Sequence, residues 1–316
     1  IIFSFHHKAL ECSMRAAEII RDAAIMAGAP AGCIGWVEKP SRDFTRALIS
    51  SPEVSLILAT GGPGMVKTAY SSGKPAIGVG AGNAPCYFEK SADIEKAVAD
   101  LLSSKTYDNG VICASEQSVV VDHEIDSVVR AVMKRNNMYF LNPEDEAKLQ
   151  NVMFDAKSGK VNPEVIGKSA MHIASLAKLS VPENTRILVV DMKDDVARHP
   201  FAVEKLSPVL GYFTANDENG ISVCESLVNN GGVGHTASIH SQDEEKILEF
   251  SLRVKACRIL VNSPSSQGAI GGVVNDYIPS LTLGCGTKGG SSTSVNVNVN
   301  DLINVKRVLV RKPGQT

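Results

Sequence analysis

The sequence predicts an α/β fold built on a parallel sheet, and three observations support that prediction. Short runs that are apolar on both faces, such as residues 54–59, are typical of strands buried in a parallel sheet. Segments with apolar residues at helical spacing, such as residues 8–27, alternate with these runs. The composition, 44% hydrophobic and 21% charged over 316 residues, is that of a globular protein long enough for two domains.

The first domain is expected over residues 1–83, where helices and strands alternate in the order typical of a doubly wound, Rossmann-type sheet. The chain starts at Ile1 in apolar sequence without an initiator methionine, which suggests an N-terminal truncation. After this first strand we expect helices over residues 8–27 and 43–49 and a third one ending at residue 72. The other expected strands are residues 34–37, 54–59 and 75–79.

A second α/β domain is expected over residues 84–290, after a boundary near Asn83 to Cys86. A turn at residues 107–110 precedes its first expected strand. The expected strands are residues 118–121, 186–190, 209–213, 237–240 and 257–261. The expected helices are residues 92–104, 125–134, 143–154, 163–177, 218–228 and 243–254.

Residues 291–316 are expected to form a terminal strand. Valine and asparagine alternate strictly over residues 295–300, and the chain stays apolar-rich to Val310. A long strand at an edge must be covered, because its unpaired backbone groups otherwise invite aggregation. A partner subunit is one such cover, so we expect an oligomerisation strand and a homo-oligomer.

Composition and cysteine usage exclude several classes of protein. The 32 Lys and Arg residues against 34 Asp and Glu residues give a net charge of -2, which excludes a strongly basic nucleic-acid binder. The seven cysteines include no C-x-x-C pair and no zinc-like spacing, so we expect no metal site and a reducing, cytoplasmic compartment. The longest apolar-looking stretch, residues 23–37, is interrupted by glycine and proline and is shorter than the roughly 20 residues of a membrane span.

Two glycine clusters follow expected strands. Thr60, Gly61 and Gly62 lie where a strand ends and a helix begins, and backbone N–H groups at such a helix start bind phosphate. A dinucleotide pyrophosphate fits there, although the strict G-x-G-x-x-G spacing is absent and a simple tight turn remains the alternative. Spacing alone favours close backbone packing for the second cluster, residues 78–82.

Three side chains are candidates for chemistry. Cys113 follows a turn, where oriented N–H groups can stabilise a thiolate; a small buried hydrophobe is the alternative. His235 lies among glycines that would leave its ring accessible in a loop, either as a base or as a solvated turn residue. Glu204 and Lys205 precede a strand and could be a surface pair.

Taken together, these segments resemble the aldehyde dehydrogenase superfamily. The resemblance covers nearly the whole chain and is closest to the CoA-acylating half of the bifunctional aldehyde-alcohol dehydrogenases of fermenting bacteria. It identifies Cys113, in the context V-I-C-A-S, with the family's nucleophile. It identifies Glu204, in E-K-L-S-P-V, with the glutamate that holds the nicotinamide ribose. The nicotinamide-binding residues it implies are Ser4, Thr60, Gly61, Gly62, Val79, Gly80, Glu204 and Leu206.

Two departures from the hydrolytic members of that family are informative. Where those enzymes carry a glutamate that activates water, this sequence has Val79 in the segment V-G-A-G. Without that base, an acyl-thioester on Cys113 should resist water and wait for a thiol such as that of CoA. Ser4 stands where the family usually has a lysine that contacts the adenine ribose.

The resemblance therefore implies an NAD-dependent, CoA-acylating acetaldehyde dehydrogenase of alcohol fermentation. Cys113 would form the thioester, and acetaldehyde and acetyl-CoA would be interconverted with CoA as co-substrate. We expect His235 to lie near the approaching CoA thiol, because a histidine titrates in the range useful for deprotonating it. The alternatives are another CoA- or phosphate-dependent semialdehyde dehydrogenase, or a scaffold module without catalysis, since full-length relatives form filaments.

Overall fold

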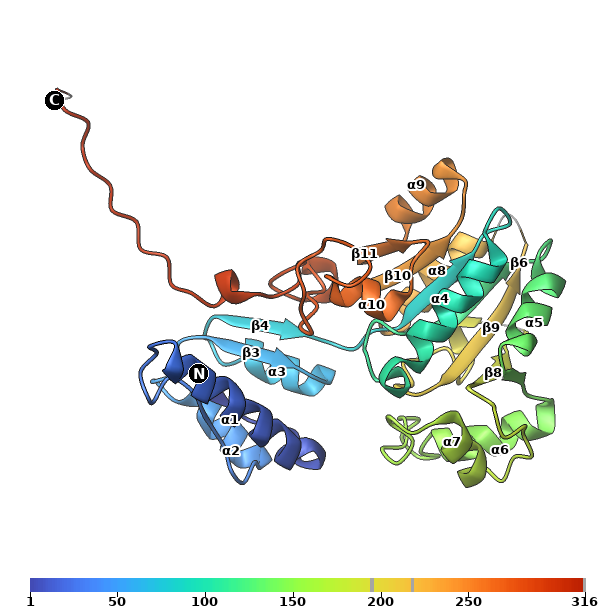
Figure 1. Ribbon diagram of the computed structural model, residues 1–316, viewed down its shortest axis with the longest axis horizontal. Helices are drawn as coiled ribbons and strands as arrows, with labels where there is room; N and C mark the ends of the chain where they lie inside the picture. The colour runs from blue at the N-terminus through green and yellow to red at the C-terminus, as the bar shows by residue number, and fades with distance from the viewer. Residues whose placement is uncertain (194–195, 217–218, 315–316) are drawn as a thin grey trace. The chain divides into compact units, whose positions relative to one another are not determined.

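The computed structural model describes residues 1–193, 196–216 and 219–314 and confirms the α/β fold class (Figure 1). The chain divides into two compact units, one formed by residues 1–58 and 67–76 and the other by residues 59–66 and the chain from Ile77 onward. This division lies closer to the N-terminus than the boundary at residue 83 expected from the sequence.

The smaller unit contains a two-stranded parallel sheet of β1 (Ile2–Phe3) and β2 (Gly35–Trp36). Its helices are η1 (His7–Ala9), α1 (Leu10–Met26) and α2 (Arg42–Ser50). The side chain of Ser41 caps α2 by accepting a hydrogen bond from the N–H of Phe44.

A second short sheet, in which β3 (Ile57–Thr60) pairs with β4 (Ala76–Val79), has α3 (Pro63–Tyr70) between its strands in the chain. The run at residues 54–59 was expected to be buried on both faces, but Leu58 is 43% exposed. Burial alternates along β3, which is the pattern of a strand with one face covered and the other exposed.

A seven-stranded sheet forms the centre of the larger unit, and all its strand pairs are parallel. The strand order is β11-β10-β5-β6-β9-β8-β7. The strands are β5 (Ala84–Phe88), β6 (Glu116–Asp122), β7 (Met138–Phe140), β8 (Ile187–Asp191), β9 (Val209–Ala215), β10 (Gly234–His240) and β11 (Ala256–Val261).

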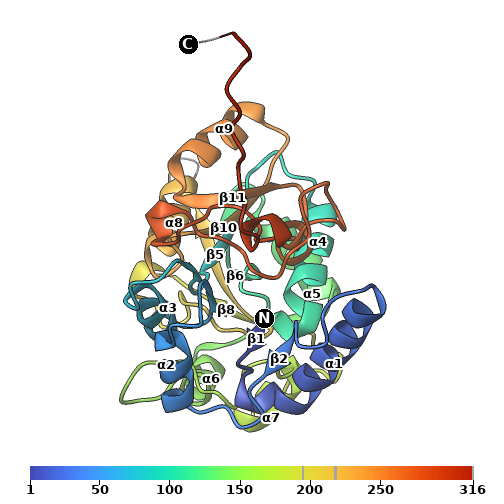
Figure 2. The ribbon, with the colours of Figure 1, turned by 90° about the vertical axis from the view of Figure 1, so that its left-hand side faces the viewer.

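Helices cover both faces of this sheet, and Figure 2 shows α4 and α5 on one side and α8 on the other. Successive residues of β6 point to opposite faces, so Val120 belongs to one apolar core and Val119 and Val121 to the other. The helices are η2 (Tyr107–Gly110), η3 (Val196–Arg198), η4 (Thr287–Gly289), η5 (Val299–Asp301), α4 (Ile94–Thr106), α5 (Asp126–Arg135), α6 (Pro143–Met153), α7 (Ala170–Leu176), α8 (Gly220–Asn229), α9 (Glu244–Arg253) and α10 (Ser265–Ile270).

Several local expectations were wrong. The helix expected over residues 163–177 is only α7, because Gly167 adopts a left-handed φ of 69° that interrupts it. The sequence did not indicate β5, β7 or α10. Glu218, the first residue of the helix expected over residues 218–228, lies outside the described residues.

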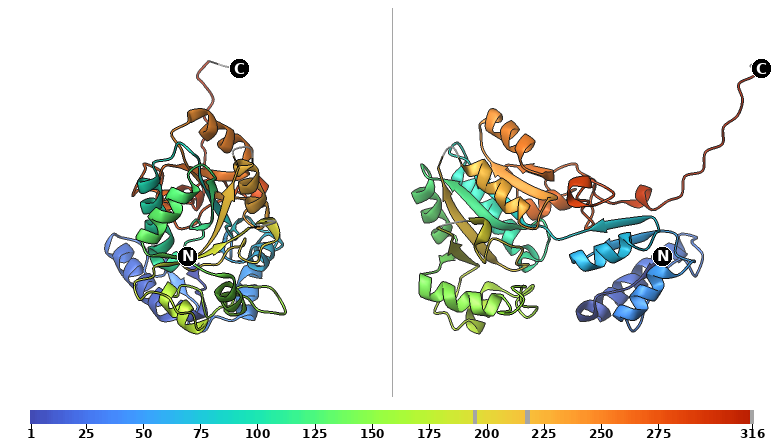
Figure 3. Two further views of the ribbon diagram at one scale, coloured as in Figure 1. Left: turned by 90° about the vertical axis from the view of Figure 1, so that its right-hand side faces the viewer. Right: turned by 180° about the vertical axis from the view of Figure 1, so that it is seen from behind.

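The terminal strand expected over residues 291–316 is not formed by the described residues of this single chain. Only an isolated bridge between Leu283 and Asn296 forms, followed by the short helix η5. Figures 1 and 3 show the following residues as extended chain with no strand beside them, and Leu309 is 91% exposed. A strand needs a neighbour for its backbone N–H and C=O groups, and the described residues supply none here.

Candidate active site

The amino ends of four neighbouring strands bring the candidate residues together. Gly82 precedes β5, Cys113 precedes β6, Glu204 precedes β9, and His235 is the second residue of β10. Because these strands are parallel and adjacent in the order β10-β5-β6-β9, their starting points meet at one edge of the sheet. The site therefore lies at the end opposite to the carboxyl ends that usually bind ligands in open α/β sheets.

Cys113 lies in a turn between η2 and β6, as the sequence predicted. Three consecutive residues before it, Asp108, Asn109 and Gly110, adopt left-handed φ values of 47°, 50° and 72°. A Cβ atom on Gly110 would lie 2.8 Å from the carbonyl oxygen of Ser207, so only glycine allows this close approach. The turn that carries Cys113 is thus packed directly against the segment that carries Glu204.

The thiol of Cys113 is half-buried and packs against a small apolar cluster of Ala114, Leu260, Ala269 and Leu283. Burial raises its pKa to about 12, and the nearby Glu204 carboxylate acts in the same direction. The backbone N–H of Cys113 itself lowers the pKa, in the direction expected of an oriented N–H group, but burial outweighs it. Cys113 is a protonated thiol in this structure and must lose its proton before it can act as a nucleophile.

Glu204 is the acidic group of the site. Its Oε1 atom accepts a hydrogen bond of 3.0 Å from the backbone N–H of Gly82. Burial raises the pKa of Glu204 to about 7, although Gly82 and the cations Lys105 and Lys205 oppose the shift. The alternative of a surface pair is wrong, because Lys205 is completely buried.

Gly82 joins the three candidate side chains. A Cβ atom at this position would lie 2.2 Å from the carbonyl oxygen of Cys113 and 3.2 Å from Cγ of His235. Both groups therefore press on the same side of the Gly82 backbone, whose N–H is bonded to Glu204. The interpretation of residues 78–82 as a place of close backbone packing is confirmed at this glycine.

His235 was expected in an accessible loop, and that expectation was wrong. The residue lies in β10 and its side chain is completely buried. Its Nδ1 atom is hydrogen-bonded to Oγ1 of Thr236 at 2.9 Å, and its Nε2 atom has no hydrogen-bond partner among the described residues. Burial, assisted by the positive charge of Arg258, lowers the pKa of His235 to about 3, so the imidazole is neutral.

Arg258 is a buried cation that the sequence analysis missed. It lies in β11 beside Thr236, and its guanidinium donates hydrogen bonds to His235 O, Gly284 O and Asn296 Oδ1 at 3.2, 2.9 and 3.0 Å. Its charge lowers the pKa of Cys113, but less than burial raises it. An arginine within the apolar strand sequence A-C-R-I-L-V was the available signal, because charged residues are rarely buried without a reason.

Two further buried charged residues, Lys105 and Glu116, support the turn of Cys113. The carboxylate of Glu116 accepts hydrogen bonds from the N–H of Ser265 and the hydroxyl of Ser104 at 3.0 and 2.5 Å. Burial lowers the pKa of Lys105 and raises that of Glu116, while their opposite charges counter both shifts. The hydroxyl of Ser265 also donates to the carbonyl of Ala114, directly after Cys113, at 2.7 Å.

The residues proposed to contact a nicotinamide cofactor fit a pyrophosphate group in one respect. Thr60 ends β3 and α3 starts at Pro63, so Gly61 and Gly62 form the strand-to-helix turn. A Cβ atom on Gly62 or Gly80 would meet nothing within 4 Å, and neither glycine has a left-handed φ. Neither packing nor backbone conformation requires glycine at these two positions, and the open space beside each would allow a ligand to approach the backbone.

The other expected cofactor residues occupy varied positions. Val79 is the last residue of β4; its side chain is completely buried and its carbonyl accepts a hydrogen bond from Gly61. Leu206 follows Glu204 by two residues and adopts a left-handed φ of 47°. Ser4 belongs to the smaller unit, where its hydroxyl lies 3.1 Å from that of Thr45.

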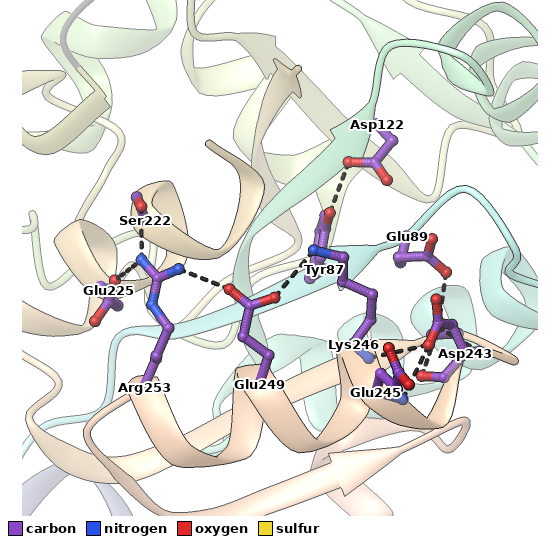
Figure 4. A network of polar contacts seen from close by, with 11 residues as sticks. Tyr87, Glu89, Asp122, Ser222, Glu225, Asp243, Glu245, Lys246, Glu249 and Arg253 are labelled. Atoms are coloured by element: carbon purple, nitrogen blue, oxygen red, sulfur yellow. Dashed lines mark hydrogen bonds and ion pairs between the residues drawn. The ribbon is translucent and has the colours of Figure 1, made fainter. Parts of the chain in front are cut away.

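A separate polar network lies toward the opposite ends of the central strands (Figure 4). The hydroxyl of Tyr87 in β5 donates a hydrogen bond of 2.7 Å to Asp122 at the end of β6. On α9, Arg253 forms ion pairs with Glu249 and with Glu225 of α8 at 2.8 and 2.6 Å. These contacts join helices and strands away from Cys113, so they offer control positions for experiments on the site.

The fold and the site define an α/β protein with a cysteine, a glutamate and a neutral histidine at the amino ends of a parallel sheet. The aldehyde dehydrogenase family matches residues 6–274, and the chain belongs to that family. It is 50% identical to the bifunctional aldehyde-alcohol dehydrogenase of Escherichia coli over 98% of this chain and 35% of that protein. The chain spans about a third of the length of such curated relatives.

Solved structures extend the comparison. An acetylating aldehyde dehydrogenase from Geobacillus thermoglucosidasius superposes with a TM-score of 0.94 at 42% identity, over 100% of this chain and 70% of that one. A propionaldehyde dehydrogenase from Rhodopseudomonas palustris, solved with bound CoA and an acylated cysteine, gives a TM-score of 0.85 at 29% identity. It is matched over 93% of this chain and 65% of that one.

Neither a membrane-spanning helix nor a metal-binding cluster is found among the described residues. No helix among them has the length and apolar character needed to cross a bilayer. Within the same ranges, no group of three or more His, Cys, Asp and Glu side chains is arranged to hold a metal ion.

Proposed function

We propose that this protein is an NAD-dependent, CoA-acylating aldehyde dehydrogenase that interconverts acetaldehyde and acetyl-CoA through a thioester on Cys113. The observation that carries the proposal is the convergence of Cys113, Glu204 and His235 on the backbone of Gly82. The relatives support it, because those of high identity are named aldehyde-alcohol dehydrogenases and acetylating aldehyde dehydrogenases. Those names give no support to a scaffold without catalysis.

The first step is attack of the Cys113 sulfur on the carbonyl carbon of the aldehyde. Because burial raises the pKa of the thiol to about 12, the sulfur must lose its proton as the new C–S bond forms and the carbonyl oxygen gains one. A bound nicotinamide cofactor would supply the acceptor for the hydride that then leaves the same carbon. Glu204 would hold the nicotinamide ribose, and the turn at Gly61 and Gly62 the pyrophosphate.

The second step transfers the acyl group from Cys113 to the sulfur of CoA. The C–S bond to Cys113 breaks as the bond to CoA forms, and the CoA thiol loses its proton. With Val79 in the place of a water-activating glutamate, the thioester persists until CoA arrives. We propose that the free Nε2 atom of the neutral His235 orients this thiol. With its pKa lowered to about 3, the imidazole is too weak a base for the proton-accepting role expected from the sequence.

The remaining assignments concern the whole protein. We propose that residues 1–83 provide most of the NAD site and residues 84–290 the catalytic residues. Residues 291–316, in which the apolar side chains from Val299 onward are exposed, would pair with another copy in a homo-oligomer. All seven cysteines are free, which supports a cytoplasmic location.

The test is a nicotinamide-linked assay of acetaldehyde oxidation with and without CoA, and separately with NAD and with NADP. The proposal predicts turnover that requires CoA and prefers NAD. A larger semialdehyde is the competing substrate: faster turnover with it, or with phosphate in place of CoA, would favour another acylating member of the family.

A further inference from the structure

Lys205 has an unusual environment for a lysine. Its side chain is completely buried, and its Nζ atom donates hydrogen bonds to the carbonyl oxygens of Gln117, Phe201 and Val203 at 2.9, 2.6 and 2.8 Å. An ammonium group has three N–H donors, so these three acceptors match it completely, whereas a neutral amine has only two. Burial and the nearby Lys105 lower the pKa of Lys205, and the three carbonyl groups favour its charged form.

Gln117 completes the arrangement from β6. Its side-chain Oε1 accepts a hydrogen bond of 2.9 Å from the backbone N–H of Lys205, and its Nε2 donates one of 2.9 Å to the carbonyl of Ser115. Its own carbonyl is one of the three acceptors of the Lys205 ammonium. Gln117 therefore ties the segment that carries Glu204 to the segment that follows Cys113.

The backbone needs such a tie, because Leu206 adopts a left-handed φ of 47° that is unfavourable for leucine. A conformation of this kind persists only where its surroundings fix it. The hydrogen bonds of Lys205 fix the backbone before Leu206. A hydrogen bond of 3.0 Å from the N–H of Gly167 to the carbonyl of Leu206 fixes the backbone after it. Glu204 lies directly before this constrained segment.

We propose that Lys205 and Gln117 form a clamp of positioning residues that holds the Glu204 carboxylate beside Cys113. The clamp residues contact neither the substrate nor the cofactor and act through Glu204. The inference rests on the proposed function for its effect on turnover, but the placement of Glu204 can be measured without turnover. Glu204 raises the pKa of Cys113, so the pH dependence of Cys113 alkylation reports whether the carboxylate is in place.

The experiment measures alkylation of Cys113 by iodoacetamide against pH, with peptide mass spectrometry to resolve this cysteine from the others. Glu204→Gln should move the profile to lower pH, because a neutral amide no longer destabilises the thiolate. Lys205→Met should move it in the same direction. In the double variant Lys205→Met/Glu204→Gln, the profile should match that of Glu204→Gln alone.

Gln117→Met tests position without removing a charged side chain. It removes the tie and a contact of 3.5 Å from the Lys105 ammonium, and it leaves the three carbonyl acceptors of Lys205. Gln117→Met should shift the alkylation profile to lower pH, by a smaller amount than Lys205→Met does. It also keeps the proposal testable if Lys205→Met folds poorly. Tyr87→Phe is the matched control, because it removes a buried hydrogen bond away from the site. Its profile should equal that of the wild-type protein.

Wild-type profiles in folded Lys205→Met and Gln117→Met would overturn the clamp, as would a shift in the double variant clearly larger than in Glu204→Gln. Single-turnover hydride transfer tests the proposed function separately. If Lys205→Met and Gln117→Met shift alkylation as predicted but Glu204→Gln leaves hydride transfer unchanged, the clamp stands and the proposed role of Glu204 fails.

Discussion

The carboxylate of Glu204 is bound at 3.0 Å to the backbone N–H of Gly82, the residue against which the carbonyl of Cys113 and the ring of His235 also pack. One glycine backbone thus sets the relative positions of an acid, a thiol and an imidazole that are far apart in the sequence. A small displacement at Gly82 would move all three groups at once, and misplacement of about 1 Å can cost 100-fold in rate.

Gly82→Ala should therefore impair both stability and activity. The new Cβ atom would lie 2.2 Å from the carbonyl oxygen of Cys113, so the backbone must shift, and overpacking of this kind costs about 1–3 kcal/mol. Chemical denaturation and the steady-state rate measure the two effects. Wild-type stability in this variant would show that the close approach of Gly82 and Cys113 is wrong.

Gly62→Ala is the contrasting substitution, because its Cβ atom would enter open space at an ordinary φ. We expect an unchanged unfolding free energy but weaker binding of the nicotinamide cofactor, since the added methyl group obstructs the pyrophosphate. Cofactor titration followed by fluorescence measures the affinity. Unchanged affinity would remove this turn from the proposed cofactor site.

Glu204→Gln should slow single-turnover hydride transfer by about 10- to 100-fold, because the nicotinamide would be less precisely placed. Since burial raises the pKa of Glu204 to about 7, the carboxylate fraction in the wild-type protein grows as the pH rises through 7. The wild-type rate should increase over that range, and the variant should lack this increase. The same pH dependence in both proteins would contradict the assignment.

Glu204→Gln should impair hydride transfer but improve the stability of the folded protein at high pH. The pKa of Glu204 is raised from its ordinary value of 4.5 to about 7, so ionisation costs folding free energy as the pH rises through this interval. Glu204→Gln removes that cost. The difference in unfolding free energy between Glu204→Gln and the wild-type protein, measured by urea denaturation, should favour the variant more at pH 8 than at pH 4. An equal difference at both pH values would indicate that Glu204 is solvated.

His235→Ala should leave the first burst of NADH intact and slow acyl transfer to CoA. Because burial holds the pKa of His235 near 3, this residue does not titrate between pH 5 and 8. The pH profile of acyl transfer should therefore have the same shape over this range in His235→Ala and in the wild-type protein. Rapid mixing with and without CoA separates the two phases. If both phases match the wild-type protein, His235 has no part in the transfer.

Much of the fold could be predicted from the sequence, because apolar periodicity reports directly on buried strands and helices. The terminal strand failed for a physical reason: the V-N-V-N-V-N alternation satisfies the pattern of a strand, but a strand also requires a hydrogen-bonding neighbour. β5 was missed because it is short and contains Pro85, which weakens any strand pattern.

The candidate site was predictable only at the level of single residues. Motifs singled out Cys113 and Glu204, and the structure brings them together. No spacing rule indicated that Arg258 would reach the carbonyl of His235, or that Lys205 would bind three carbonyl groups. Those contacts depend on the strand order and on the path of a loop, which a single sequence does not report.

The role of Cys113 as nucleophile can be tested by finding which residue carries the acyl group. The protein is incubated with acetaldehyde and NAD in the absence of CoA, and the acyl adduct is located by peptide mass spectrometry. We expect an acetyl thioester on Cys113 that persists in water and disappears when CoA is added. We also expect no adduct and no turnover in a folded Cys113→Ser variant. An adduct on another cysteine, or wild-type turnover in that variant, would show that Cys113 is not the nucleophile.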